Sequence, residues 1–462
     1  MGDVTHYDLV IIGAGSGNMI AGREFASLDV ATIEERLFGG TCLNVGCIPT
    51  KMYVYPADLI RGVGHLRDLG VTAHVDAVDW PAIRDRIFGR IDPMPADARA
   101  WRQSLPRHTV YDTHARFTGL RTLAVADPDG GADLEVTADQ IVVAAGSRVN
   151  LPELPGLDSV PYETSDTIMR LDALPERMVI VGAGIVAAEF AHVFSAFGTQ
   201  VTQVVRGDRL LRGQDHAISD RFAELAAGQW DLRTGHRPVR VAQDADGITV
   251  TLDDGSAVSG DVLLLATGRV PNSDRLDVAA GGIETADDGV IVVDEFQRTN
   301  VPGVWALGDI ANRFELKHVA NHEARVIRHN LLNPDDLLAA DHSVVPGAIF
   351  SSPQIAYAGL TEERAVEAGL SFVTSVHPYA DVAYGWAMED RGHFVKLVAD
   401  PGAGTILGAH IIGPDASTLI QPLVQAMSLG TSVTEMARGQ FWIHPALTEV
   451  VENALLGLRL DD

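Results

Sequence analysis

Two cysteines are the residues of this chain with the clearest capacity for chemistry. Cys42 and Cys47 lie in the segment GGTCLNVGCIPTK, residues 39–51, with four residues between them, and the 462-residue chain has no other cysteine. Two thiols on a short, constrained segment can alternate between a dithiol and a reducible disulfide. We therefore predict a redox-active pair that cycles by exchanging electrons.

Three other roles for the pair are open. A structural disulfide would be unusual in a reducing cytoplasm. A zinc site needs four ligands, and the sequence shows no companion cluster of Cys and His, so no metal is expected. Two inert core cysteines fit poorly into a segment rich in Gly, Thr and Asn. The redox pair is the interpretation that these residues favour.

Composition limits the class of protein. The chain is 46% hydrophobic and 21% charged, which is typical of a globular protein, and its length predicts two to four domains. A net charge of −27 argues against nucleic-acid and membrane partners. We found no apolar run long enough for a membrane span and no signal peptide, so we expect a soluble, cytoplasmic protein. Lysine occurs at only three positions, Lys51, Lys317 and Lys396.

The N-terminal stretch YDLVIIGAGSGN predicts a strand, a glycine turn and a following helix from Met19 to Ser27. Glycines allow the backbone to approach a pyrophosphate, and the helix N-terminus favours its charge. Glu34 follows the second strand, where a carboxylate can bind ribose hydroxyls. Asn18 replaces the last glycine of the usual fingerprint. The glycines concerned are Gly13, Gly15 and Gly17. We interpret this unit as an FAD site, against the alternative of an ordinary strand–helix turn.

A second stretch, RMVIVGAGIVAAEFAHVFSAFGTQVTQVVR, repeats the pattern with Gly182, Gly184 and Ala187. Arg206 follows its second strand at the position where an NAD site would have an acid, and Arg212 comes six residues later. Two guanidinium groups suit a 2′-phosphate, so we predict that this unit binds NADPH. The alternative is that both arginines are solvated surface charges.

The order of these patterns predicts an α/β protein with two Rossmann-like domains and a C-terminal α+β domain. We expect an FAD-binding domain in two parts, 1–149 and 271–341, interrupted by an NADPH-binding domain, 150–270. An interface domain of strands and helices follows at 342–462. In the second FAD part, a strand in VPGVWALGDI ends before Asp309, whose carboxylate suits a cofactor hydroxyl, and LKHVANHEARVIRHNLL predicts a helix.

Taken together, the motifs resemble those of the class I pyridine nucleotide–disulfide oxidoreductases, which include glutathione reductase and dihydrolipoamide dehydrogenase. GGTCLNVGCIPTK, GAGIVAAEFA, ATGRVPN, ALGD and HPALTE occur in the order of that family and cover the whole chain. DVAYGWAMED and MARGQFWIHPALTEVVENALLGL are most similar to the subgroup that reduces the disulfide of a glucosamine–inositol thiol. The resemblance implies an FAD enzyme that transfers hydride from NADPH and reduces a small disulfide.

The resemblance also implies a role for each site residue. Cys47 would be the thiolate beside the flavin, and Cys42 the thiol that attacks the substrate. Lys51 would lie at flavin N5, paired with Glu189, where a cation stabilises reduced flavin. Other cofactor contacts are implied for Thr41, Ala115, Gly146, Gly268, Asp309 and His318.

His444 and Glu449 match the catalytic dyad of the family. An imidazole can protonate a leaving thiolate, and a carboxylate can orient it. In the family this dyad belongs to the partner subunit, which implies a homodimer with a shared active site. Taken alone, the His-Pro pair would be a weak signal, more often a turn.

Some residues distinguish this chain from other enzymes of the family and from a flavin protein without enzymatic activity. Ile185 stands where glutathione reductase has a tyrosine that gates the nicotinamide pocket. The C-terminus lacks the extra cysteines of mercuric reductase and large thioredoxin reductases, and soluble transhydrogenases lack the cysteine pair. Dihydrolipoamide dehydrogenase, the main enzymatic alternative, would prefer an acidic residue at the position that Arg206 occupies. A flavin redox sensor without turnover would not need the proton donor His444.

Overall fold

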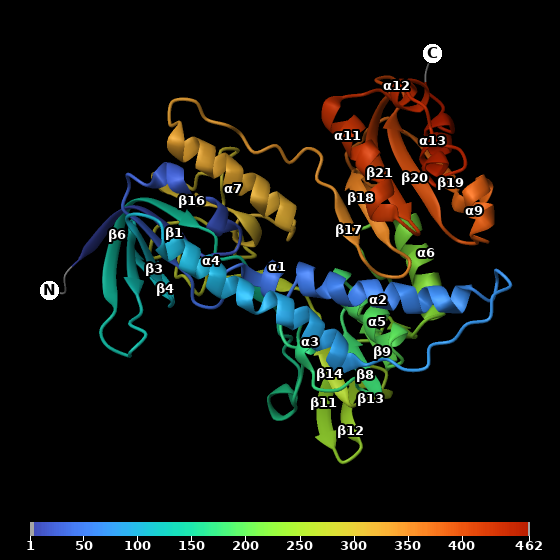
Figure 1. Cartoon of the computed structure of the whole chain (residues 1–462), viewed down its shortest axis with the longest axis horizontal. Helices are drawn as coiled ribbons and strands as arrows, with labels where there is room; N and C mark the ends of the chain where they lie inside the picture. Colours follow the sequence, from blue (N-terminus) through green and yellow to red (C-terminus); the bar gives the residue numbers. More distant parts are fainter. Residues whose placement is uncertain (1–3, 461–462) are drawn as a thin grey trace. The chain divides into compact units, whose positions relative to one another are not determined.

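The computed structural model describes residues 4–460, which form two compact units (Figure 1). The first unit comprises the chain up to Thr50, Ala82–Asn150 and Gly268–His342. The second comprises Lys51–Pro81, Leu151–Thr267 and the chain from Ser343 onward. The four-segment domain division expected from the sequence stays a prediction. The α/β class expected from the sequence is confirmed.

The first unit is built on a seven-stranded sheet in the order β3-β2-β1-β6-β5-β4, with β16 also paired to β6. Its centre is parallel, because β1 pairs in parallel with β2 and β6, and β16 with β6. The strands are β1 (Thr5–Ile12), β2 (Val30–Ile33), β3 (His108–Tyr111), β4 (Ala115–Gly119), β5 (Thr122–Val125), β6 (Leu134–Val143) and β16 (Val304–Ala306). Side chains alternate along β1, so both faces of the sheet are buried.

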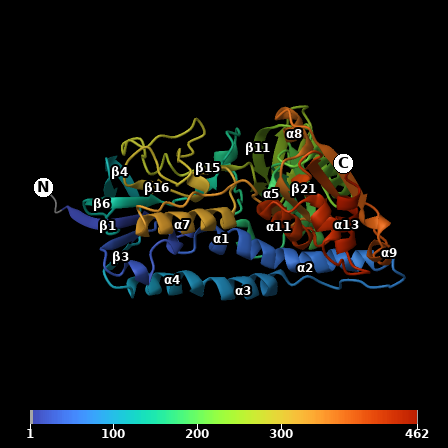
Figure 2. The ribbon, with the colours of Figure 1, turned by 90° about the horizontal axis from the view of Figure 1, so that it is seen from above.

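Two hydrophobic cores cover these faces. Leu9 and Ile11 of β1 pack in one core with Ala320 and Ala324 of helix α7 (Lys317–Leu332). Val10 and Ile12 lie in the other core, with residues of β4 and β5. The helix predicted around LKHVANHEARVIRHNLL is therefore confirmed as α7, and Figure 2 shows it running alongside β1. Its first turn lies near the carboxyl ends of β1 and β16, where α/β sheets bind ligands, because Lys317 contacts Ser16 and Ala320 lies beside Gly308.

The helix predicted from Met19 to Ser27 is wrong. The structure has two short 3-10 turns there, η1 (Ser16–Met19) and η2 (Arg23–Phe25), with Gly22 extended between them. The guanidinium of Arg102 donates to the Ala21 carbonyl, which a continuous helix would need for its own ladder. Glycine also disfavours a helix interior by about 1 kcal/mol relative to alanine. A tertiary contact therefore replaces the local helix.

Arg102 also explains why Asn18 stands at the position where the usual fingerprint has its last glycine. It lies on helix α4 (Pro93–Gln103), is fully buried, and its Nε donates to Asn18 Oδ1 at 2.6 Å. Burial lowers the pKa of Arg102 to about 10. The asparagine that replaces the expected glycine thus binds a buried guanidinium from another part of the chain.

The second unit contains a four-stranded parallel sheet in the order β10-β9-β8-β14. Its elements are β8 (Arg177–Val181), β9 (Gln200–Val205), β10 (Asp231–Thr234), β14 (Val262–Leu265), α5 (Ile185–Ala196) and α6 (His216–Ala227). An antiparallel sheet of β11 (Pro238–Asp244), β12 (Gly247–Leu252) and β13 (Ala257–Gly260) accompanies it. Strand, glycine turn, helix and strand follow one another here as the sequence predicts.

The C-terminal part of the second unit is a five-stranded antiparallel sheet, β17-β18-β21-β20-β19. Its strands are β17 (Gly347–Ile349), β18 (Ile355–Gly359), β19 (Val373–Pro378), β20 (Phe394–Asp400) and β21 (Thr405–Ile412). Helices α11 (Gln421–Leu429) and α13 (Thr448–Leu456) pack on this sheet (Figure 1), while α9 (Ala383–Ala387) follows β19. Between residues 4 and 460, no helix is long and apolar enough to cross a membrane.

Candidate active site

The glycine turn after β1 approaches the backbone of β6 too closely for a side chain. Gly13 has φ +100°, and a Cβ there would lie 2.3 Å from the Ala144 carbonyl oxygen. Gly17 packs on the Ala144 methyl, and a Cβ on Gly15 would meet only Gly40 at 3.7 Å. The turn therefore leaves a backbone surface that suits a pyrophosphate.

Glu34 closes this turn from the end of β2. Its carboxylate accepts hydrogen bonds from the backbone N–H of Ala14 at 2.7 Å and of Arg36 at 2.9 Å. Burial raises the pKa of Glu34, and these backbone bonds oppose the rise. A carboxylate has lone pairs beyond these two bonds, so it can also accept from ribose hydroxyls. These residues fit the dinucleotide end of FAD.

Asp309 lies on the short turn η5 (Gly308–Ile310), directly after β16. Its Oδ2 accepts from the Ser147 hydroxyl at 2.7 Å, and that hydroxyl accepts from Arg269 Nε at 2.7 Å. Ser147 and Arg269 belong to β7 (Ser147–Val149) and β15 (Arg269–Pro271), which pair with each other. The paired strands β7 and β15 thus meet beside Asp309.

The other residues expected to contact FAD are spread over the first unit. Thr41 is on helix α1 (Gly40–Asn44), and His318 is on the first turn of α7. Gly146 and Gly268, at φ +62° and +107°, precede β7 and β15. Ala115 begins β4 with its side chain in the core, so its backbone is the part that can contact a cofactor.

Cys42 lies on α1, and Cys47 begins helix α2 (Cys47–His65). Cys42 is half-buried, Cys47 is exposed, and the two side chains are present as thiols. The hydrogen bond to Cys47 is the main cause that raises the pKa of Cys42, followed by burial and by repulsion from the Cys47 charge. Of the two thiols, Cys42 therefore keeps its proton longer, which favours Cys47 as the thiolate. Their exposure argues against an inert core pair.

Lys317 is a site residue that the sequence analysis missed, although the rarity of lysine was a signal. Its Nζ donates to the Ser16 hydroxyl at 3.0 Å, and that hydroxyl donates to Asn321 Oδ1 at 3.0 Å. The glycine turn beside Ser16 packs on the start of α1, because a Cβ on Gly40 would lie 2.8 Å from the Gly15 Cα. The charge of Lys317 lowers the pKa of Cys42, against the larger effects that raise it.

We expect that Lys317→Met shifts thiolate formation to higher pH. Burial lowers the pKa of Lys317, and the charges of both cysteines raise it, so by reciprocity the ammonium favours both thiolates. Without it the pKa of the thiols rises further, and less thiolate is present at a given pH. The pH dependence of iodoacetamide alkylation of the reduced protein measures this. Lys317→Arg, which keeps the charge, is the control; an unchanged midpoint in Lys317→Met would contradict the prediction.

In the second unit, Lys51 forms a close ion pair with Glu189. Lys51 is one turn into α2, and its Nζ donates to both carboxylate oxygens at 2.8 and 2.6 Å. Glu189 is buried on α5 and also accepts from the backbone N–H of Phe350 at 2.9 Å. The Phe350 ring lies 5.0 Å from Nζ. The ammonium is thus held in one place by a buried carboxylate, as the resemblance implies.

The second glycine turn has the space that a dinucleotide needs. Gly182 has φ +153°, and a Cβ there would lie 2.2 Å from the Ala266 carbonyl oxygen. Gly184 is the N-cap of α5, and a Cβ on it would meet nothing within 4 Å. Ala187 is fully buried, and Ile185 is the first residue of the helix. The open helix N-terminus suits a pyrophosphate.

The two arginines predicted to bind a 2′-phosphate lie at the end of β9. Arg206 is exposed directly after the strand. The guanidinium of Arg212 lies over Gly207, because a Cβ on that glycine would collide with Nη2. Arg212 is also 4.0 Å from Asp208. The loop after β9 therefore places the Arg212 guanidinium beside Gly207, the residue that follows Arg206.

We expect Arg206→Glu to move cofactor preference from NADPH toward NADH. Each charge-assisted phosphate contact contributes about 1.5–3 kcal/mol. Loss of the Arg206 contact should therefore lower kcat/KM for NADPH by roughly tenfold to hundredfold. Comparing kcat/KM for the two cofactors measures the change. Arg209→Glu is the matched control, since Arg209 is on the same loop but pairs with Asp220. Equal efficiency with both cofactors in the unmodified enzyme would contradict the prediction.

His444 and Glu449 form a hydrogen-bonded pair near the C-terminus. His444 Nδ1 lies 2.7 Å from Glu449 Oε1, and the imidazole is 71% exposed, with Nε2 outside this bond. Glu449 lies in the first turn of α13, and its other oxygen accepts from the Ala446 N–H at 3.3 Å. The bond to His444 holds the pKa of Glu449 below its ordinary value, so the carboxylate is lost only as the pH falls into the acid range. The pair can present an imidazole to another molecule.

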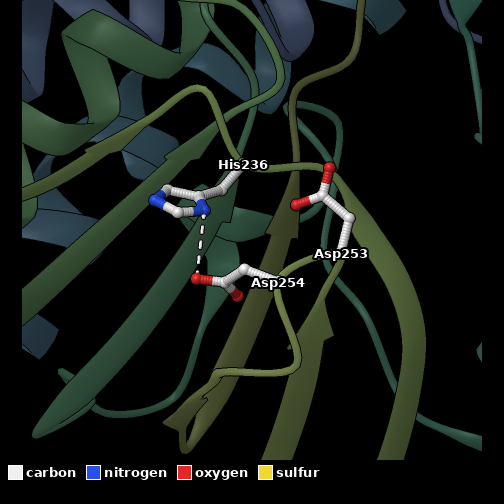
Figure 3. A group of neighbouring side chains, drawn as sticks. All are labelled: His236, Asp253 and Asp254. Atoms are coloured by element: carbon white, nitrogen blue, oxygen red, sulfur yellow. Dashed lines mark ion pairs between the residues drawn. The ribbon is translucent and has the colours of Figure 1, made fainter.

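One group of three possible metal ligands is found between residues 4 and 460, formed by His236, Asp253 and Asp254 (Figure 3). Their ligand atoms lie within 4.8 Å of one another, on exposed or half-buried loops of the second unit. His236 Nδ1 is 3.6 Å from Asp254, and hydrogen bonds from Ser256 are the main cause that lowers the pKa of Asp254. Neighbouring protein groups thus account for this geometry without an ion.

Comparison with known proteins decides the family. A model described as pyridine nucleotide-disulphide oxidoreductase matches residues 7–324, and a model of the dimerisation domain of the same family matches residues 345–455. The chain belongs to this family. The predicted class I resemblance is confirmed, and the enzyme is an NADPH-dependent FAD disulfide reductase. Bound FAD supplies the route by which electrons pass between the nicotinamide and the cysteine pair.

Relatives of the oxidoreductase are similar over nearly its whole length. It is 51% identical to mycothione reductase of Mycobacterium tuberculosis, covering 98% of this chain and 99% of the relative. It is 33% identical to dihydrolipoyl dehydrogenase of Haloferax volcanii, covering 98% of each. Among solved structures, the copper(II) complex of the flavoprotein disulfide reductase RclA of Escherichia coli has a TM-score of 0.86 at 26% identity, covering 98% of this chain and 99% of that chain.

Proposed function

We propose that this oxidoreductase reduces mycothione, the disulfide of the glucosamine–inositol thiol mycothiol. The observation that supports this substrate is the 51% identity to mycothione reductase over 98% of the chain. Identity to the dihydrolipoyl dehydrogenase and glutathione reductase relatives is 30–33%. The likeness therefore favours one substrate class within a family that acts on several.

The cysteine pair performs the exchange with the substrate. The Cys42 thiolate attacks one sulfur of the substrate disulfide, forms a mixed disulfide and releases the first thiol. Cys47 then attacks the Cys42 sulfur and releases the second thiol, which leaves a Cys42–Cys47 disulfide. FAD, when bound, would supply the two electrons from NADPH that return this disulfide to the dithiol. The raised pKa of Cys42 means that its thiol loses a proton before it attacks, while Cys47 is the thiolate of the resting pair.

Charged side chains and glycine turns would hold the cofactors in the proposed site. Glu34 and Asp309 would accept from hydroxyl groups of FAD, and Lys51, held by Glu189, would supply the cation for the flavin. The glycines of the first turn, with Thr41, Ala115, Gly146, Gly268 and His318, complete the FAD contacts. Gly182, Gly184, Arg206 and Arg212 bind NADPH. The contacts already made by Glu34, Asp309 and Lys51 support these roles.

His444 is the proton donor for the leaving thiol, and Glu449 orients its ring. We infer that the imidazole serves the cysteine pair of the partner subunit in a homodimer. The dimerisation domain that matches residues 345–455 and the exposure of His444 support this arrangement. We also propose a cytoplasmic location, where the substrate would be recycled, and no nucleic-acid or membrane partner, in keeping with a net charge of −27.

Dihydrolipoamide dehydrogenase activity is the second candidate, since the relatives named dihydrolipoyl dehydrogenase are similar over 98% of the chain. Arg206 and Arg212 argue against it, because two cations at the end of β9 suit the phosphate of NADPH better than the hydroxyls of NADH.

A panel of disulfides tests the proposal. NADPH oxidation would be followed with mycothione, glutathione disulfide, lipoamide and trypanothione as substrates. We expect kcat/KM for mycothione to exceed the others by at least about a hundredfold, because a site built to bind polar groups rejects analogues that leave them unpaired. A higher kcat/KM for lipoamide, with NADH as the better cofactor, would instead establish the second candidate.

A further inference from the structure

A buried carboxylate lies directly behind the turn that carries Asp309. Glu323, in the second turn of α7, is 1% exposed. Its Oε2 accepts from the backbone N–H of Gly308 at 2.7 Å. Both of its oxygens also accept from Asn312 Nδ2 at 3.0 Å. One side chain thus binds the residue before Asp309 and the residue three positions after it.

The geometry of the turn explains why it needs such an acceptor. Gly308 lies two residues beyond β16, so its N–H is outside the strand ladder, and its φ of +74° turns the chain that follows it. A buried N–H without an acceptor loses its hydrogen bond to water and gains nothing in return. Glu323 removes that cost, while Ser147 binds the Asp309 carboxylate from the other side. The orientation of Asp309 is therefore set from two directions.

Glu323 is itself held by the segment that ends the first unit. The imidazole Nε2 of His342 lies 3.0 Å from Glu323 Oε1. His342 packs between the rings of Phe314, at 5.5 Å, and His322, at 6.2 Å. The backbone N–H of Asp341 donates to the His322 ring. The hydrogen bonds to Glu323 come from the Gly308 N–H and the Asn312 side-chain amide, and such donors are the condition for a buried charge to be tolerated.

We propose that Glu323 is a positioning residue for FAD: it fixes the Gly308–Asp309 turn so that the Asp309 carboxylate meets a cofactor hydroxyl. The inference rests on the proposed role of Asp309, and it does not depend on which disulfide is reduced. Glu323 does not contact the cofactor in this role, and it acts through the backbone of Gly308.

The test measures FAD binding and not turnover. Apoprotein of Glu323→Ala would be reconstituted with FAD, and the dissociation constant obtained from quenching of flavin fluorescence. We expect a rise of roughly tenfold to hundredfold, the equivalent of one lost hydrogen bond to a charged acceptor. Glu323→Gln keeps an oxygen for the Gly308 N–H and should recover most of the affinity. Glu323→Met, which is of similar length but has no oxygen to accept from Gly308, is the test protein if the alanine variant does not fold.

Asn330→Ala is the matched control. Asn330 lies on the same helix, is equally buried, and bonds the backbone of Phe296 and Leu338, away from Asp309. We expect this substitution to lower the unfolding temperature of the apoprotein without weakening its binding of FAD. If its effect on the dissociation constant equals that of Glu323→Ala, the role of Glu323 is general stability and the proposal is overturned.

A double-mutant cycle with Asp309→Ala separates the remaining outcomes. If Glu323 acts through Asp309, the double variant binds FAD no more weakly than Asp309→Ala alone, because the effects are not additive. Additive losses would overturn the proposal, as would unchanged affinity in the variants that lack the acceptor oxygen, Glu323→Ala or Glu323→Met. Unchanged affinity in Asp309→Ala would show instead that the role assigned to Asp309 is wrong, and the role of Glu323 would fall with it.

Discussion

Cys42→Ser enzyme, mixed with its cofactors, should have no disulfide reductase activity but keep a long-wavelength absorption band. The band arises when a thiolate donates charge to oxidised FAD, and Cys47 is the thiolate in the proposed site. Removing Cys42 eliminates the attack on the substrate and leaves Cys47 in place. The hydrogen bond that raises the pKa of Cys42 supports this order of proton loss. Absorption spectra recorded against pH, with steady-state turnover, measure both effects.

Cys47→Ser is the matched comparison. It should also stop turnover, because the mixed disulfide with substrate cannot be resolved, and it should lose the absorption band. Mass spectrometry should then find Cys42 joined to one half of the substrate. The roles of the two cysteines would be reversed if the band persisted in Cys47→Ser and was absent from Cys42→Ser at alkaline pH.

The His444→Ala variant should slow the oxidative half-reaction by roughly 10²–10⁴-fold. A leaving thiolate has a pKa of about 8.5, so protonation near neutral pH lowers the barrier to its departure. An imidazole gives up a proton readily in this range, and the 2.7 Å bond to Glu449 orients it. Flavin reduction by NADPH should change little, because His444 takes no part in hydride transfer. Stopped-flow measurement separates the two half-reactions.

Subunit mixing tests whether His444 serves the partner. Cys42→Ser and His444→Ala chains are each inactive alone, yet a heterodimer of the two would keep one complete site. Activity should return as the subunits exchange, which differently tagged chains can verify. Normal turnover of His444→Ala would remove the histidine from the mechanism. Absence of rescue after verified exchange would exclude the shared site.

Features made by neighbouring residues could be predicted from the sequence. Both glycine turns, α7, the C-terminal strands and the family were evident, because strand–turn–helix patterns and motif spacings are local. The pairing of His444 with Glu449 is of this kind, since only five positions separate them. The cysteine pair is also local, although the direction of the pKa shift of Cys42 needed its burial and its bond to Cys47.

Features made by distant residues needed the tertiary structure. The helix predicted at Met19–Ser27 failed because Arg102, 81 positions from Ala21, takes the Ala21 carbonyl and also binds Asn18. Lys317 could not be connected to Ser16, 301 positions earlier, by any local pattern.

The sequence by itself determined the family, the cofactors and the residues able to react, because each reactive type stands in a recognisable local motif. The family resemblance also implied the pairing of Lys51 with Glu189, but the tertiary structure alone decided the other contacts that hold these residues. Ser147, for example, lies 162 positions from Asp309. In the sequence, Glu323 is not distinguished from the other polar residues of its helix. In the structure it is buried and accepts a hydrogen bond from the Gly308 N–H. Hydrogen bonds between segments depend on how the chain packs, and residue type and spacing do not encode that packing locally.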